Sequence, residues 1–135
     1  MRKELDAKLV AEFPNLYKDR HGDMKETCMC WGIECGDGWY NIIRDLSAFL
    51  EDEIAKTFPE DIRVHCKASQ VKSKFGQLRF DMVVSTNEMN EAIEKASDLS
   101  AKTCETCGKP GSARSNYGWI STSCDKCNTL RKNNG

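Results

Sequence analysis

Apolar residues recur at three- and four-residue steps from Trp39 to Ile54, and this spacing predicts a long amphipathic helix. Asp37 stands just before this stretch and is positioned to act as the N-cap. Pro59 disfavours helical geometry in the residue before it, so the helix should end near Phe58. Because most of its apolar side chains are large, we expect this helix to form the core, with Trp39 buried.

Two further helices are predicted from the same periodicity. Residues 2–13 place apolar side chains four positions apart and stop before a proline. Residues 85–99 carry an apolar face behind Ser85 and Glu88, which match the S-x-x-E capping box. Residues 128–132 are expected to add a short terminal helix.

Strands are predicted where apolar and polar residues alternate. Alternation runs from Ile62 to Ala68 and again from Leu78 to Val84, as in strands with one solvated face. The connection from Ser69 to Gly76 is too long for a tight hairpin, so we expect a broad basic loop between the two strands. Together these elements predict an α+β fold in which three helices pack on a short antiparallel sheet.

Four cysteines near the C-terminus form two C-x₂-C pairs separated by sixteen residues: Cys104, Cys107, Cys124 and Cys127. This spacing is typical of a four-thiolate zinc site, because each short turn presents two sulfurs to one ion from the same side. Two disulfides or free thiols are the alternatives. Four thiolates leave no coordination position for water or substrate, so the site would be structural.

The cysteine pairs divide the chain. We expect an α+β domain over residues 1–102 and a zinc-binding module over residues 103–135, with a zinc-ribbon or treble-clef-like arrangement. One zinc ion would stabilise this module, since metal-binding free energy can serve as folding free energy.

Composition is that of a soluble globular protein, with 39% hydrophobic and 30% charged residues among 135. No apolar run approaches the roughly 20 residues of a membrane span, and the N-terminus lacks an apolar signal core. Eight cysteines without such a signal favour a reducing cytosol. The net charge of −1 is unevenly distributed: residues 28–60 are acidic, whereas residues 61–80 and 104–135 are mildly basic.

Two other regions that contain cysteines or glycines are candidate sites. Residues 32–40 contain three glycines before a helix, but their acids would repel a phosphate, so a tight turn is favoured over a ligand site. A second metal site from Cys28, Cys30, Cys35 and Cys66, with His21 or His65 as further ligands, is left open, although buried reduced thiols are the favoured interpretation. Cys35 as a nucleophile lacks an associated base.

The candidate partner-binding residues lie in the basic region 67–79: Lys72, Lys74, Phe75 and Arg79. Lysine and arginine around an aromatic side chain can contact phosphate and stack on a base. The alternative is a solvated loop whose Phe75 inserts into the core. The sequence contains no recognisable set of catalytic residues, so we expect no enzyme.

Four short motifs in this order carry a resemblance: residues 32–39, 70–80, 104–111 and 119–124. Together they resemble a group of small uncharacterised tailed-bacteriophage proteins with a C-terminal four-cysteine zinc motif. The resemblance implies an accessory protein made in the cytoplasm of a bacterial host, where it would bind a host protein and inhibit a defence system. The alternative is a nucleic-acid or nucleotide-binding module that uses the 67–79 loop and the C-terminal basic residues. The sequence leaves the partner's identity and the oligomeric state open.

Overall fold

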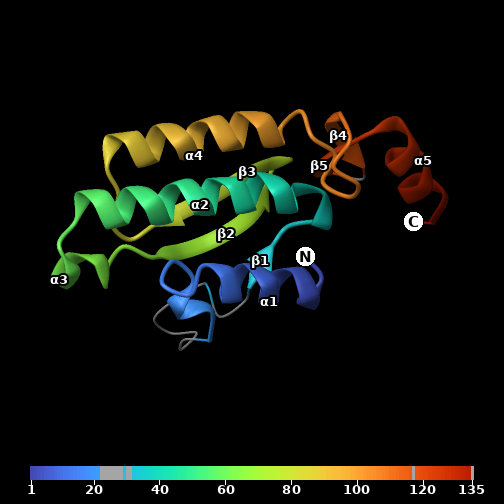
Figure 1. Cartoon of the computed structure of the whole chain (residues 1–135). Helices are drawn as coiled ribbons and strands as arrows, with labels where there is room; N and C mark the ends of the chain where they lie inside the picture. The colour runs from blue at the N-terminus through green and yellow to red at the C-terminus, as the bar shows by residue number, and fades with distance from the viewer. Residues whose placement is uncertain (22–28, 30–31, 117, 135) are drawn as a thin grey trace.

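The computed structural model describes residues 1–21, 29, 32–116 and 118–134. These residues form an α+β fold in which two helices lie side by side over a small sheet (Figure 1). The helices are α2 (Tyr40–Thr57) and α4 (Asn87–Ser100). The sheet contains β1 (Ile33–Glu34), β2 (Ala68–Lys74) and β3 (Gln77–Met82), in that order. The predicted α+β class is confirmed.

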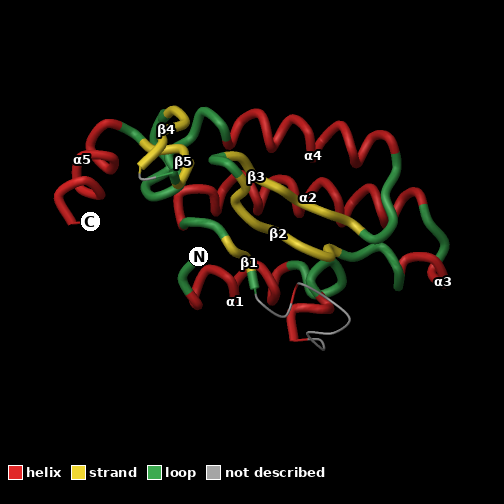
Figure 2. Tube along the Cα trace, turned by 180° about the vertical axis from the view of Figure 1, so that it is seen from behind, coloured by secondary structure: helices red, strands yellow, loops and turns green. Residues whose placement is uncertain are grey.

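The remaining elements lie at the edges of this two-layer unit. Helix α1 (Lys3–Glu12) and the 3-10 turn η1 (Lys18–His21) lie near β1, and the short α3 (Glu60–Arg63) follows α2. A second sheet of two strands, β4 (Ser112–Asn116) and β5 (Trp119–Ser123), precedes α5 (Asp125–Asn134) at one end of the molecule (Figure 2). The described residues thus form five α-helices. The predicted C-terminal helix is present as α5 and is longer than expected, whereas the short α3 was not predicted.

The main sheet is mixed, which corrects the prediction of an antiparallel one. β2 and β3 are antiparallel, but β1 pairs parallel to β2, with Ile33 opposite Val71. The strand β1 is too short for alternation to reveal it. Asp6, which is buried on α1, holds this strand in place: its carboxylate accepts hydrogen bonds from the Ile33 backbone N–H at 3.0 Å and from Arg20 at 2.9 Å.

The first predicted strand was placed wrongly. Residues 60–63 are helical, and Ile62 and Val64 are exposed, whereas β2 occupies the segment that was predicted to be a broad basic loop. A register shift between Ala68 and Gln70 brings both Ala68 and Val71 to the buried side, three positions apart. This bulge breaks the period of two on which strand recognition depends.

Two predicted helix caps were also wrong. Thr86, not Ser85, caps α4 by accepting a hydrogen bond from the Met89 N–H at 3.1 Å. Asp37 does not cap α2; it begins the 3-10 turn η3 (Asp37–Trp39), and its carboxylate accepts from the Arg2 backbone N–H at 2.8 Å. The end of α2 before Pro59 is as predicted, with Phe58 already extended.

The hydrophobic core lies between the helices and the sheet. The buried stripe of α2 packs with side chains from β2, β3, α4 and α1, and Tyr17 meets Phe80 edge to face at a centroid distance of 6.4 Å. Trp39 has 0% exposure, which confirms its predicted burial. Within the part of the chain that the structure describes, this core cluster contains no residue beyond Ala96. The same described residues include no helix both long and apolar enough to cross a membrane.

Candidate functional site

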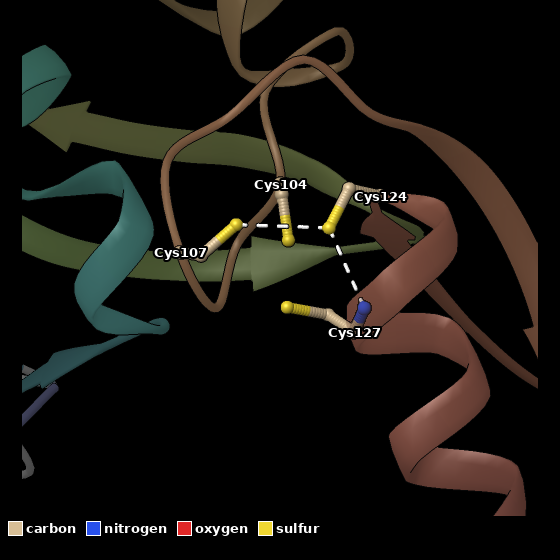
Figure 3. Close-up of side chains that lie close together, drawn as sticks. All are labelled: Cys104, Cys107, Cys124 and Cys127. Atoms are coloured by element: carbon tan, nitrogen blue, oxygen red, sulfur yellow. Dashed lines mark hydrogen bonds between the residues drawn. The ribbon is translucent and has the colours of Figure 1, made fainter.

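The four cysteines come from a turn and from the start of a helix. Cys104 and Cys107 lie in the turn that follows α4, while Cys124 and Cys127 lie just before and within the first turn of α5. The β4–β5 hairpin connects the two pairs and returns the chain to its starting point. All four side chains therefore gather between the turn and the helix (Figure 3).

The spacing of the sulfurs fits a tetrahedral metal centre. All four Sγ atoms lie within 4.8 Å of one another, and those of Cys107 and Cys124 are 3.7 Å apart. A metal bound at about 2.3 Å by four thiolates places neighbouring sulfurs about 3.8 Å apart. The Cys127 backbone N–H also points at the Cys124 sulfur, at 3.4 Å. The cluster could hold a metal ion, and the predicted ligand residues are brought together by the fold.

The electrostatics of the cluster favour a cation. Burial raises the pKa of Cys104, but N–H groups of Cys107, Cys124 and Thr106 outweigh this effect and lower the pKa to about 6. Burial, followed by the neighbouring sulfurs, raises the pKa of Cys127 to about 12. Thiolates this close repel one another, so all four sulfurs can ionise together only if a cation compensates their charge.

Nothing in the described residues assembles the second metal site considered from the sequence. Cys28, Cys30 and the His21 side chain lie outside the described part of the chain. Cys35 and Cys66 are buried, and burial raises the pKa of both thiols. The pKa of Cys35 rises to about 12, and the negative charge of the nearby Glu105 carboxylate is the second cause of this rise. A thiol that stays protonated is a poor nucleophile, which argues against Cys35 in that role.

Glu105, between the first two cysteines, joins the four-cysteine cluster to the segment before α2. Its backbone oxygen accepts from the Gly38 N–H at 2.7 Å, and its carboxylate accepts from the Gly36 N–H at 3.1 Å and the Ser73 hydroxyl at 3.2 Å. The Trp39 indole N–H donates to the Thr103 carbonyl at 2.9 Å. The glycine-rich segment 32–40 is therefore a docking site for the cysteine turn, a role that no sequence signal at Glu105 indicated.

Gly38 is required here by close packing. A Cβ at this position would overlap the Cys104 carbonyl oxygen and lie 2.6 Å from the Gly108 nitrogen. We therefore expect Gly38→Ala to lower the free energy of unfolding by about 2–3 kcal/mol, because overpacking displaces rigid backbone. Urea denaturation measures this change. A Cβ at Gly118 would meet no atom within 4 Å, so Gly118→Ala should lower the free energy of unfolding by only about 1 kcal/mol, because alanine is strained in the left-handed backbone conformation there. Equal losses would contradict the packing argument.

The four predicted partner-binding residues lie on the β2–β3 hairpin rather than in a loop. Lys74 and Gln77 pair across a two-residue turn whose central residues both have positive φ, 53° at Phe75 and 79° at Gly76, as a type I′ turn requires. Phe75 does not enter the core: it is 73% exposed, with the Lys74 ammonium 5.9 Å from its ring centre.

The turn of the β2–β3 hairpin lies against β5. The Thr122 hydroxyl donates to the Gly76 carbonyl, and Ile120 lies on the same side of β5 as Thr122 and close to Gly76. Ile120 is itself exposed. We call the group formed by Lys72, Lys74, Phe75, Arg79 and Ile120 the hairpin surface. Ile120 was missed from the sequence, because only the docking of the two sheets places it there.

Acidic side chains partly neutralise the hairpin surface. Arg79 forms an ion pair with Asp81 at 3.1 Å, and Glu34 stands beside Lys72 in the register of the sheet. Arg79 stands between buried Leu78 and Phe80, so its side chain lies on the face of the sheet away from α2 and α4, and Lys72, its cross-strand partner, shares that face.

No protein-family model matches this chain, and neither the characterised proteins nor the solved structures that were searched include a significant match. The resemblance to the tailed-bacteriophage group therefore stays a prediction. What the structure defines is an α+β protein with a cluster of four cysteines able to hold a metal ion.

Proposed function

We propose that this protein is a non-enzymatic zinc-binding protein that recognises another protein through the hairpin surface. The proposed metal is zinc, because four sulfurs at tetrahedral spacing match its preference in structural sites. The order of cysteine turn, hairpin and helix supports a treble-clef-like module rather than a ribbon. A four-thiolate site leaves no position for substrate, so its role is to hold the module in place.

The observation that carries the binding proposal is the conformation of Phe75. An aromatic residue with φ of 53° is strained, and the strain is not offset by burial because the ring is 73% exposed. Asparagine or glycine would suit this turn better. An exposed aromatic side chain kept at a cost in stability, next to exposed Ile120, fits an anchor residue for a partner.

The biological setting rests on the resemblance described above. In that setting, the protein acts in the cytoplasm of a bacterial host and binds a host protein, so as to inhibit a defence system. A single-stranded nucleic acid is the second candidate partner, supported by Phe75 with Lys72 and Lys74 on the strand that precedes it. We favour a protein because Glu34 and Asp81 oppose phosphates at this surface.

Salt-dependent titration distinguishes the two partners. We expect no appreciable fluorescence polarisation change with mixed single- or double-stranded DNA or RNA at physiological ionic strength. Nucleic-acid contacts would make affinity fall steeply with salt. Tight binding by the wild type, abolished in Lys72→Glu/Lys74→Glu, would contradict the protein-partner proposal and support the alternative.

Phe75→Asn is expected to separate stability from binding. The substitution should raise the free energy of unfolding by about 1 kcal/mol, because asparagine tolerates the left-handed conformation of the turn. It should also abolish recovery of the partner when the tagged protein is purified from infected cells. Denaturation and quantitative mass spectrometry measure the two effects.

Val64→Ala is the matched control for that experiment, since Val64 is exposed and lies near α3, at the far end of the molecule from β5 (Figure 1). It should leave partner recovery unchanged. If Phe75→Asn recovers as much partner as the wild type, the binding site lies elsewhere. If Phe75→Asn lowers the free energy of unfolding, the turn is not of type I′.

A further inference from the structure

A second candidate interface lies on the helical side of the molecule. A groove of about 890 Å³ runs between α2 and α4 and ends at the cysteine turn, where Cys107 and Gly108 contribute to its lining. Figure 1 shows the two helices side by side along most of their length. This groove shares no lining residue with the hairpin surface.

The floor and walls of the groove are apolar. Each helix contributes three side chains with the spacing i, i+4 and i+7: Ile42, Leu46 and Phe49 from α2, and Ala92, Ala96 and Leu99 from α4. Leu46 is buried in the floor, whereas Phe49 and Leu99 are 41% and 53% exposed. Two large apolar side chains therefore remain in contact with solvent along a preformed groove, as in sites that receive an amphipathic helix.

The rim of the groove is acidic. The lining includes four carboxylates, from Asp37, Asp45, Glu88 and Glu91, against one ammonium group, that of Lys95. Asp37 is paired with Arg2, but in the described part of the chain no ion pair or hydrogen bond is formed by the side chains of Glu88 or Glu91. The α4 side of the rim therefore carries two carboxylates against the single ammonium group of Lys95, a net negative charge above an apolar floor.

We propose that the α2–α4 groove binds a cationic amphipathic helix of a partner protein. The apolar face of that helix would cover Phe49 and Leu99, and its lysine or arginine side chains would meet Glu88 and Glu91. The lining on α4 spans Glu88 to Leu99, about 17 Å at 1.5 Å per residue, so the bound segment would have about three turns. Complementary charge fixes the choice of occupant, because an acidic helix would be repelled.

The test uses a fluorescein-labelled peptide of fourteen lysines and leucines in all, arranged with a helical apolar face, and measures fluorescence polarisation with the full-length protein. A scrambled peptide of the same composition tests for amphipathicity. Glu88→Lys/Glu91→Lys should weaken binding of the amphipathic peptide at least about tenfold. Phe49→Ala should weaken it as well, through the floor of the groove.

Glu94→Lys/Asp98→Lys is the matched control. These residues lie on the same helix and give the same change in net charge, but they line a different depression, beside β3. The control variant should bind the amphipathic peptide with an affinity within about twofold of that of the wild type. Charges outside the groove act on the peptide only at long range, where salt screens them. Circular dichroism confirms that all variants are folded.

Four outcomes would overturn the proposal. They are equal weakening by both charge-reversal pairs, equal binding of the scrambled peptide, absence of binding by the wild type, and occupation of the groove by a second copy of the chain. The last would appear in analytical ultracentrifugation as a dimer that Phe49→Ala dissociates. The hairpin variant Phe75→Asn should bind the peptide normally, so failure of this proposal and failure of the proposed function give different results.

Discussion

Replacing Cys104 with serine is expected to abolish zinc binding and to unfold the segment from residue 103 onwards. The four sulfurs lie within 4.8 Å of one another, and without a cation their ionised forms repel. Metal binding contributes about 10–16 kcal/mol to the folding of small zinc modules, so this is the largest effect we expect. Elemental analysis should find one zinc ion per wild-type chain and none in Cys104→Ser.

Residues 1–100 should keep most of their helical circular dichroism in that variant. The described core cluster contains no residue beyond Ala96, so all of its side chains come from the segment before the cysteine turn. We expect a lower melting temperature nevertheless, because the hydrogen bonds of Glu105 to Gly36 and Gly38 would be lost. Unfolding of the whole chain would show that the predicted boundary near residue 103 does not separate independent units.

Cys66→Ser is the control for the loss of metal. Cys66 is buried, and its thiol donates to the Ile62 carbonyl at 3.5 Å, a contact that serine can preserve. This variant should retain one zinc ion per chain. A wild-type protein without zinc, or a Cys104→Ser variant that keeps it, would contradict the assignment of the metal site.

Trp39→Ala is expected to lower the free energy of unfolding by about 3–5 kcal/mol, the usual range for removing a large aromatic side chain from a core. The indole has 0% exposure, and its N–H donates to the Thr103 carbonyl. The substitution therefore removes packing and one link to the cysteine turn. Urea denaturation followed by circular dichroism measures the change in stability.

Two other variants separate these contributions. Trp39→Phe keeps much of the packing but leaves the Thr103 carbonyl without its donor, which should cost about 1–3 kcal/mol. Trp119→Ala makes the same truncation at a side chain that is 69% exposed, and should change stability by no more than about 0.5 kcal/mol. If Trp39→Ala unfolds at the same urea concentration as the wild type, the indole is not part of the core.

Local sequence patterns were sufficient to predict the core helix and the cysteine cluster. The stripe from Trp39 to Ile54 has the period of a helix, and Pro59 stops it by a steric effect on the preceding residue. The two C-x₂-C pairs identified the four sulfurs that the structure brings together, because a short spacer constrains each pair regardless of the rest of the fold.

The β2–β3 hairpin shows why other elements were misread. A bulge between Ala68 and Gln70 shifts the buried side of β2, so alternation pointed to residues 62–68 instead. The turn has Phe75 where asparagine or glycine is usual, so its sequence does not resemble a type I′ turn. Both features depend on the partner strand, and neither leaves a periodic signal.

By itself, the sequence determined the α+β class, the core helix α2, the burial of Trp39 and the four cysteines that cluster, because these follow from periodicity and spacing within one segment. Only the tertiary structure decided the docking of Glu105 on Gly36 and Gly38, the parallel pairing of β1 and the acidic groove between α2 and α4. These features join residues tens of positions apart. Their energies depend on close approach and charge in three dimensions, which no local pattern records.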